Sequence, residues 1–295
     1  DTHRLCAIVD GNEEWSLDLP YRPLGIIKTA APSCYVLSDN TDLKHSGIHV
    51  YSADGKELEH IRIPGYHGFT LPTVHRDASI AYLKKDTLLA DESGNLLYPD
   101  SNQTWLVYLN STHEVQFEYP IECYVAYDKP IITDDFIALF TNSGVTCLTR
   151  SGELLWSHDG MYFSKHADYH PTGLLLGADV DRTLQAFNPN GVLQWDQQVK
   201  YSFVRQISHT QNNVFALMVR TDSDLQQGVS KVVKSDKARD VVKEALESHW
   251  VCCFDLKGNL VWKSSIPDSL GALTAANDQM FAVSTSDYVA VFGDE

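Results

Sequence analysis

Short runs of hydrophobic residues alternate with polar turn residues along most of the chain. The stretch from Gly173 to Val199 shows this best, because LLLGA, TLQAF and VLQWDQQ are separated there by polar segments at 179–182 and 188–191. Runs of this length, rich in Leu, Val and aromatic residues and bounded by Gly, Asn, Asp or Pro, are typical of β-strands joined by tight turns. The pattern therefore predicts three successive strands over residues 173–199.

The end of this stretch recurs along the chain as a glycine followed, four residues later, by an aromatic residue. The complete copies are Gly11/Trp15, Gly152/Trp156, Gly191/Trp195 and Gly258/Trp262. Two copies are incomplete: Glu59 replaces the aromatic residue after Gly55, and His113 replaces the glycine before Phe117. The six anchors stand 44, 58, 39, 39 and 67 residues apart. A repeat of about 40 residues with four strands in each unit is typical of a β-propeller blade.

The two anchor residues have a physical reason to recur together. Glycine adopts the positive φ that a tight hairpin requires. The aromatic residue opens the next strand, where its ring can fill the space between neighbouring sheets. An unrelated all-β sandwich with ordinary hairpins is the alternative, but it would not preserve the spacing.

We therefore predict an all-β fold in which residues 1–295 form a single β-propeller domain with six four-stranded blades. The N-terminal residues give two strands and the C-terminal residues three, so we expect both ends to pair in one closing blade, with one strand surplus. An extra hairpin, TLLADESGNLLYPD, interrupts the second blade. Seven blades remain an alternative, if the interval from 55 to 113 contains a degenerate blade.

One segment departs from the strand pattern. Residues 220–248 carry Val241, Val242, Ala245 and Leu246 at helical spacing, which predicts a helical insertion within the fifth blade. Its part from Lys231 to Glu247 has five basic and four acidic residues. The insertion either packs on the propeller or serves as a lid or partner-binding element, because insertions in repeat proteins often build the binding face.

Composition and charge narrow the class of partner. The formal net charge of −16 argues against nucleic acid or anionic lipid, which an acidic protein repels. No run of eighteen apolar residues is present, so we expect no membrane insertion. A partner protein with a basic surface suits this charge, although acidity also serves solubility.

The cysteines bear on the compartment. None of the six has CxxC spacing, and most lie in apolar strand patterns, where a thiol acts as a small hydrophobic group. This favours a reducing compartment such as the cytoplasm. The sequons at Asn102 and Asn110 and the absence of a signal peptide before Asp1 leave a processed secreted or periplasmic form open.

The run FIALFTNSGVTCLTRSGELLW resembles the pyrroloquinoline-quinone-type repeat of quinoprotein-like propellers, within the broader WD40-like superfamily. GLLLGADVDRTLQAFNPNGVLQW and VCCFDLKGNLVW are similar to it. The resemblance implies a propeller that acts as a scaffold or assembly factor, since most single-chain members bind no quinone. The quinone enzymes have a vicinal disulfide, which Cys252 and Cys253 do not favour because a strand directs neighbouring side chains to opposite faces. The run that ends in VLQW also resembles arylsulfotransferase-like propellers, which use a histidine as acceptor.

The richest polar constellation is His166, Asp168 and His170. On a strand these side chains share one face, so two imidazoles and a carboxylate could converge on a divalent metal near the central channel. The alternative is a residue that recurs for structural reasons, because His75 and His209 occupy similar places in their repeats. No GxSxG, Walker or dinucleotide-binding motif is present.

These observations predict a non-enzymatic protein-interaction scaffold with no cofactor. The predicted partner-binding residues lie in the insertion and are Lys237, Arg239, Val241, Val242 and Leu246. The alternative function is a propeller enzyme, arylsulfotransferase-like or quinoprotein-like, or a protein that binds a metal or small ligand at the His/Asp site.

Overall fold

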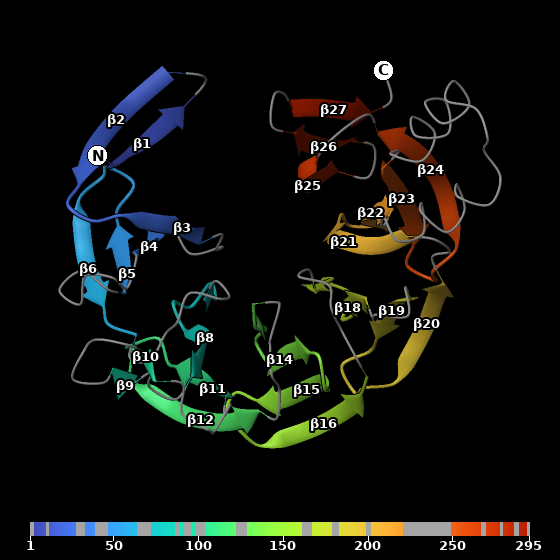
Figure 1. The fold of residues 1–295 in the computed structure, drawn as a ribbon, viewed down its shortest axis with the longest axis horizontal. Coiled ribbons are helices and arrows are strands. Elements are labelled where there is room, and N and C mark those ends of the chain that lie inside the picture. Colours follow the sequence, from blue (N-terminus) through green and yellow to red (C-terminus); the bar gives the residue numbers. More distant parts are fainter. Residues whose placement is uncertain are drawn as a thin grey trace. The chain divides into compact units, whose positions relative to one another are not determined.

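A series of antiparallel sheets, formed in chain order, makes up the protein (Figure 1). The computed structural model describes residues 3–9, 12–27, 33–38, 47–63, 72–85, 89–90, 96–97, 104–121, 129–160, 167–178, 183–198, 202–220, 249–266, 270–277, 280–285 and 289–293. These residues divide between two compact units, Asp1–Leu155 and Trp156–Glu295.

The first unit begins with a two-stranded sheet of β1 (His3–Val9) and β2 (Asn12–Leu19). A four-stranded sheet follows, made of β3 (Pro23–Ile27), β4 (Cys34–Ser38), β5 (Ile48–Tyr51) and β6 (Glu57–Ile61). The next sheet contains β7 (Thr73–Val74), β8 (Ile80–Lys85), β11 (Thr104–Leu109) and β12 (Val115–Ile121), and between β8 and β11 the chain forms a separate hairpin of β9 (Leu89–Ala90) and β10 (Leu96–Leu97). The third four-stranded sheet contains β13 (Ile131–Ile132), β14 (Phe136–Thr141), β15 (Gly144–Thr149) and β16 (Leu154–Asp159), and the boundary between the units falls within β16.

The second unit continues the same plan. One four-stranded sheet contains β17 (Asp168–Tyr169), β18 (Leu175–Ala178), β19 (Thr183–Phe187) and β20 (Leu193–Gln198). The next contains β21 (Ser202–His209), β22 (Asn213–Arg220), β23 (His249–Asp255) and β24 (Leu260–Ile266). The last sheet has three strands, β25 (Leu270–Asn277), β26 (Met280–Thr285) and β27 (Val289–Gly293).

The strand prediction is confirmed for all five complete blades, and so is the hairpin inserted in the second. The long interval between residues 55 and 113 was the possible place of a seventh blade. Among its described residues, the only strands outside the first and second blades are those of this two-stranded hairpin, which supports the count of six. The two N-terminal and three C-terminal strands also form as predicted, while their pairing in one closing blade stays a prediction. No helix occurs among the described residues, and the insertion after Arg220 lies outside them.

The core lies between the faces of consecutive sheets. The middle strands are buried on both sides, as in β14, where all six residues are buried. One hydrophobic cluster joins the β3–β6 sheet to the β7–β12 sheet through residues such as Leu37, Ile48 and Tyr82. A second cluster joins the two four-stranded sheets of the second unit around Leu184, Trp195 and other buried residues. Sheets that are apolar on both faces stack in this way because neither face can be left in water.

The recurrent aromatic residue of one sheet lies on the recurrent glycine of the next. A Cβ atom added at Gly258 would lie 2.7 Å from the Trp195 ring, and one added at Gly191 would lie 2.6 Å from the Trp156 ring. The same contacts join Trp15 to Gly55 and Phe117 to Gly152. All four glycines have positive φ. Each ring thus requires a glycine beneath it, for space as well as for backbone conformation, which confirms the predicted place of the ring between sheets.

The tryptophan rings are also fixed by hydrogen bonds. The indole Nε1–H of Trp195 donates to the Leu256 carbonyl at 3.0 Å, and that of Trp156 donates to the Pro189 carbonyl at 2.8 Å. In both cases the acceptor lies two residues before the glycine, so the ring and its polar atom bind one turn. We call each such ring–glycine contact an aromatic joint.

One joint has both partners replaced together. Where β6 meets the β11–β12 turn, Glu59 takes the place of the aromatic residue and His113 that of the glycine, and Glu59 Oε1 lies 3.0 Å from His113 Nδ1. His113 keeps the turn conformation, with φ of 60°, although it is not glycine. The His113 side chain occupies the space that an aromatic ring would need. This explains why the loss of the glycine at 113 goes together with the loss of the aromatic residue at 59.

Candidate functional site

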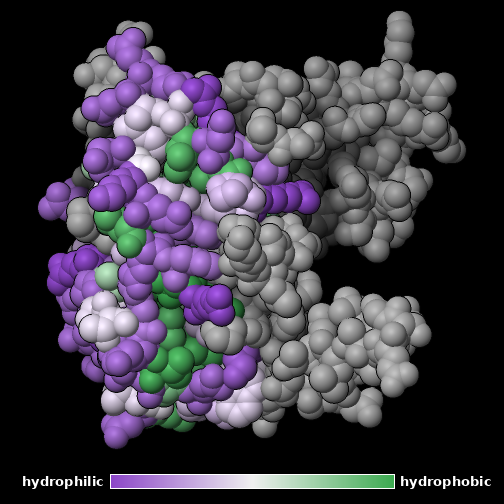
Figure 2. All heavy atoms as spheres, turned by 90° about the vertical axis from the view of Figure 1, so that its left-hand side faces the viewer, coloured by the Kyte–Doolittle hydropathy of each residue, from purple (hydrophilic) through white to green (hydrophobic). Residues whose placement is uncertain are grey.

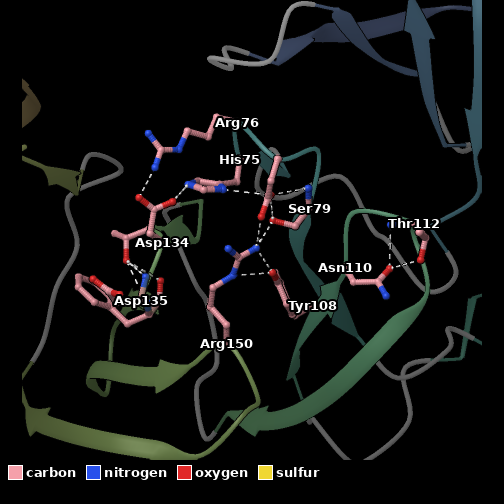
Figure 3. A network of polar contacts seen from close by, with 12 residues as sticks. His75, Arg76, Ser79, Tyr108, Asn110, Thr112, Asp134, Asp135 and Arg150 are labelled. Atoms are coloured by element: carbon pink, nitrogen blue, oxygen red, sulfur yellow. Dashed lines mark hydrogen bonds and ion pairs between the residues drawn. The ribbon is translucent and has the colours of Figure 1, made fainter.

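The most extensive polar network of the described residues surrounds Arg150, in the turn between β15 and β16 (Figure 3). Its guanidinium donates to Asp77 Oδ2 and to Ser79 Oγ, each at 2.7 Å, and its Nε–H donates to Tyr108 Oη at 2.7 Å. Asp77 and Ser79 belong to the β7–β8 turn and Tyr108 to β11. Arg150 therefore links the β13–β16 sheet to the preceding sheet of the same unit, which contains β7, β8, β11 and β12.

The charges in this network stabilise one another. Burial opposes ionisation of Asp77, but hydrogen bonds from Ser79 and Arg150 outweigh it and hold the pKa of Asp77 well below its usual range. Burial likewise lowers the pKa of Arg150, and its hydrogen bonds to Asp77 and Tyr108 outweigh that effect and raise it. Both groups are permanently ionised near neutral pH, so neither can transfer protons as a general acid or base.

The turns between first and second strands also contact one another. His75 Nδ1 lies 3.0 Å from Asp77 Oδ1, and His75 Nε2 lies 3.5 Å from Asp134 Oδ1 in the β13–β14 turn. Arg76 pairs with the other oxygen of Asp134. In Figure 3 these side chains converge between the two turns. The contacts of His75 and Arg76 with Asp134 link the turns of two neighbouring sheets.

The second unit has a corresponding contact around His170. Nε2–H of His170 donates to the Thr210 carbonyl at 2.7 Å, and Nδ1 accepts from Thr172 N–H at 3.1 Å and lies 2.7 Å from Thr172 Oγ1. These partners fix the neutral form of the ring. Asp168 Oδ2 accepts from His209 Nδ1 at 2.7 Å, and the rings of His209 and His170 meet edge to face.

The structure thus brings together Asp168 and His170, two of the three predicted metal ligands, but gives each a protein partner. His166 lies outside the described residues, so metal binding by the set stays a prediction. Among the residues that are described, no group of three or more His, Cys, Asp and Glu side chains could hold a metal ion.

The state of His170 leads to a pH prediction. Burial is the main cause that lowers its pKa. An unfolded chain takes up a proton on this histidine near pH ~6.5, before the folded chain does, so stability should be full above that pH and fall as the pH decreases through it. We expect His170→Gln, which keeps a donor for Thr210 without titrating, to reduce this loss.

The measurement is the free energy of unfolding in urea at about pH 5 and about pH 7.5 for both proteins. His209→Gln serves as the matched control, since its ring is only partly buried. If His170→Gln loses as much stability on acidification as the native chain, the assignment is wrong.

Every four-stranded sheet exposes large apolar side chains at or just before the start of its fourth strand, which is an edge strand. Val192 and Leu193 are 56% and 42% exposed at β20, and Leu260 and Val261 are 54% and 58% exposed at β24. The corresponding residues elsewhere are Leu58 at β6, Val115 at β12, and Leu154 and Leu155 at β16. Figure 2 faces the side of the first unit that carries β2 and β6, and hydrophobic patches interrupt the mainly hydrophilic surface there.

The predicted partner-binding residues of the insertion, from Lys237 to Leu246, lie outside the described residues. The adjacent cysteines are described: Cys252 and Cys253 are both free and buried within β23. Burial raises the pKa of Cys252 to about 11, and the two side chains belong to consecutive positions of a strand.

The Arg150 network could not be predicted from the sequence because its members are far apart, with Asp77 and Arg150 separated by 73 positions. The signal was the recurrent turn before each second strand. The backbone N–H of His75, Thr133, His170 and Thr210 closes that turn in four sheets, through hydrogen bonds to Ser79, Phe136, Leu174 and Asn213. His209 thus lies one residue before the position equivalent to His170, and its pairing with Asp168 could not be read from spacing.

Among solved structures, the chain resembles BamB from Moraxella catarrhalis, at 11% sequence identity and a TM-score of 0.55, over 99% of this chain and 79% of that one. It also resembles Hsv2p from Kluyveromyces lactis, at 11% identity and a TM-score of 0.59, over 92% of this chain and 74% of that one. A second structure of that Hsv2, with loop 6CD complete, gives 10% identity, a TM-score of 0.60 and coverage of 92% and 73%. No protein-family model and no curated protein matches the chain.

At these identities the likeness concerns the fold alone. Both proteins are β-propellers, and BamB has PQQ-like repeats. No helix in the described ranges has the length and hydropathy that crossing a membrane demands. The sheet order, the repeat and these neighbours agree that the chain has a β-propeller fold.

Proposed function

We propose that the chain is a protein-binding scaffold that has no catalytic site of its own. The observation that carries this proposal is the exposed apolar start of the fourth strand, which recurs at β6, β12, β16, β20 and β24. An edge strand that also exposes Leu or Val offers backbone hydrogen bonds and hydrophobic contacts to an added segment. The β-propeller neighbours support a protein-binding scaffold in general.

The polar residues support the same proposal by what they do. Arg150, Asp77 and His170 each make several hydrogen bonds, and each has at least one that links neighbouring sheets. Groups held in this way stabilise a scaffold rather than activate a substrate. The net charge of −16 favours a partner with a basic surface, because long-range attraction speeds the encounter of oppositely charged proteins.

The finer part of the proposal concerns residues 220–248. Lys237 and Arg239 bring basic groups to an acidic chain, and Val241, Val242 and Leu246 have the spacing of a helix that docks in a groove. We propose that this insertion and the exposed start of β24, which belongs to the same sheet as the flanking strands β22 and β23, together form the binding surface. The metal site predicted at His166, Asp168 and His170 stays the alternative proposal.

The test of the scaffold is capture of partners from an extract of the source cells, with the native chain and two variants as bait. One variant replaces residues 222–247 with a short Gly/Ser linker, and the other is Leu260→Ser/Val261→Ser. Gln194→Ser, an exposed polar residue of β20, is the control.

We expect all four baits to keep the same melting temperature within a few degrees, because Leu260, Val261 and Gln194 are exposed and the replaced segment departs from the repeated strand pattern. The native chain and the control should retain the same proteins, and at least one variant should lose them. If the two variants retain every partner, the binding surface lies elsewhere. If the native chain captures nothing above an unrelated acidic bait, the scaffold proposal is contradicted.

A further inference from the structure

We infer that the joint between β6 and the β11–β12 turn is the point at which the first unit opens locally. This inference concerns the motion of the fold and is independent of any partner. It rests on the contrast between this joint, made by Glu59 and His113, and the aromatic joints elsewhere in the chain.

The first observation is the loss of buried apolar surface. At an aromatic joint a whole ring covers the turn, as Trp195 does at Gly258, and the ring itself is 8% exposed. Burying such a ring stabilises the contact by the hydrophobic effect. The side chain of Glu59 is 50% exposed, and a partly solvated polar contact of this kind contributes little.

The second observation is an unsatisfied polar atom. His113 Nδ1 contacts Glu59, but His113 Nε2 is buried and has no hydrogen-bond partner among the described residues. A buried nitrogen without a partner loses its hydration and gains nothing in return. Opening the joint would let water reach this nitrogen, so the open state restores the hydrogen bond to water that is missing in the closed state.

The third observation is the backbone. His113 has φ of 60°, a conformation that glycine adopts freely and that a residue with a Cβ adopts at a cost. The aromatic joints have glycine at this position, at Gly55, Gly152, Gly191 and Gly258. All three effects therefore act in the same direction, toward an easier separation of the β6 and β12 edges.

The opening is confined to the outer edge. Inward of this joint, the cluster that includes Leu37, Ile48 and Tyr82 packs the same two sheets together with residues that are at most 1% exposed. We therefore expect the edge strands and the turn at residues 110–114 to separate while these inner strands stay packed.

Four equivalent backbone hydrogen bonds provide the test. His113 N–H donates to Asn110 O at 2.9 Å, and the N–H groups of Gly152, Gly191 and Gly258 donate to Thr149, Asn188 and Asp255, each at 3.0 Å. Because these amides share one geometry, their native-state hydrogen exchange can be compared directly after correction for intrinsic rates. We expect the His113 amide to exchange on the order of tenfold faster than the other three.

Two double variants test whether the polar joint is the cause of the faster exchange at amide 113. Glu59→Trp/His113→Gly restores an aromatic joint and should slow exchange at amide 113 to the rate of its counterparts. Glu59→Trp alone should not, because His113 still fills the place of the ring. Trp195→Glu/Gly258→His transfers the polar joint to the second unit and should speed exchange at amide 258 alone.

The inference is overturned if amide 113 in the native chain is protected as well as amides 152, 191 and 258. It is also overturned if Glu59→Trp/His113→Gly folds, as judged by an unchanged circular dichroism spectrum, and leaves that exchange rate unchanged. If the variant Glu59→Trp/His113→Gly fails to fold, hydrogen exchange at amide 113 is measured in the single variant His113→Gly instead. It removes the strained backbone and the unsatisfied nitrogen, so exchange should slow even without the ring.

Discussion

Trp195→Ala should lower the free energy of unfolding by about 3–5 kcal/mol, the range found when a large aromatic residue is truncated in a core. The ring of Trp195 lies on Gly258, packs in the cluster with Phe254, and donates a hydrogen bond to the Leu256 carbonyl. The substitution removes all three contacts and leaves a cavity between two sheets. Urea unfolding of the native and variant chains measures the loss.

The control for this prediction is Trp195→Phe. It keeps most of the ring and removes only the indole N–H, so we expect it to cost about 1 kcal/mol, the typical value of one hydrogen bond. A loss for Trp195→Ala that is no larger than that of Trp195→Phe would contradict the role of the aromatic joint.

Arg150→Met should be the next most harmful change, with a loss of about 2–3 kcal/mol. Methionine retains apolar contacts but leaves Asp77 with no guanidinium and Tyr108 with one donor fewer. We set the value at the lower end for a charged network because the side chains of Asp77 and Arg150 are 39% and 25% exposed, and water offsets part of the loss.

The pH dependence of the free energy of unfolding provides a second test of the role of Arg150. The pKa of Asp77 lies below its usual range, so its contribution to stability is present above about pH 4 and is lost as the pH falls further. In Arg150→Met that acid loss should become smaller. Arg76→Met is the control, because Arg76 is well exposed and pairs with Asp134 rather than Asp77. Equal losses for the two variants would contradict the assignment.

The strands and their grouping into blades could be predicted from the sequence, because tight turns and buried strands each demand particular residues. Gly191 and Trp195 are recognisable for that reason alone. Spacing did not reveal which glycine each ring meets, since Trp156 lies on Gly191 of the next repeat rather than on Gly152 of its own. The exchange of Glu59 and His113 appeared in the sequence as two separate defects. Only the fold shows that they are one contact.

The candidate site was harder to predict, for a related reason. Arg150 is an ordinary turn residue by sequence, and its partners come from two other strands or turns of the preceding sheet. His170 was predicted as a ligand because of its spacing from Asp168, but its hydrogen bond to the Thr210 carbonyl depends on the neighbouring sheet. Contacts between repeats leave no periodic signal within a repeat.

The central claim is that, at each aromatic joint, the ring of one sheet requires the glycine of the next sheet beneath it. The most direct test is a double-mutant cycle on Trp195→Ala and Gly258→Ala, measured by urea unfolding. Gly258→Ala in the native chain places a Cβ 2.7 Å from the Trp195 ring at a φ of 83°, whereas in Trp195→Ala only the backbone strain remains. We therefore predict that the double variant loses about 1–3 kcal/mol less stability than the sum of the two single variants, because that amount is the cost of overpacking. Additive losses would show that the ring and the glycine act independently, and would contradict the account.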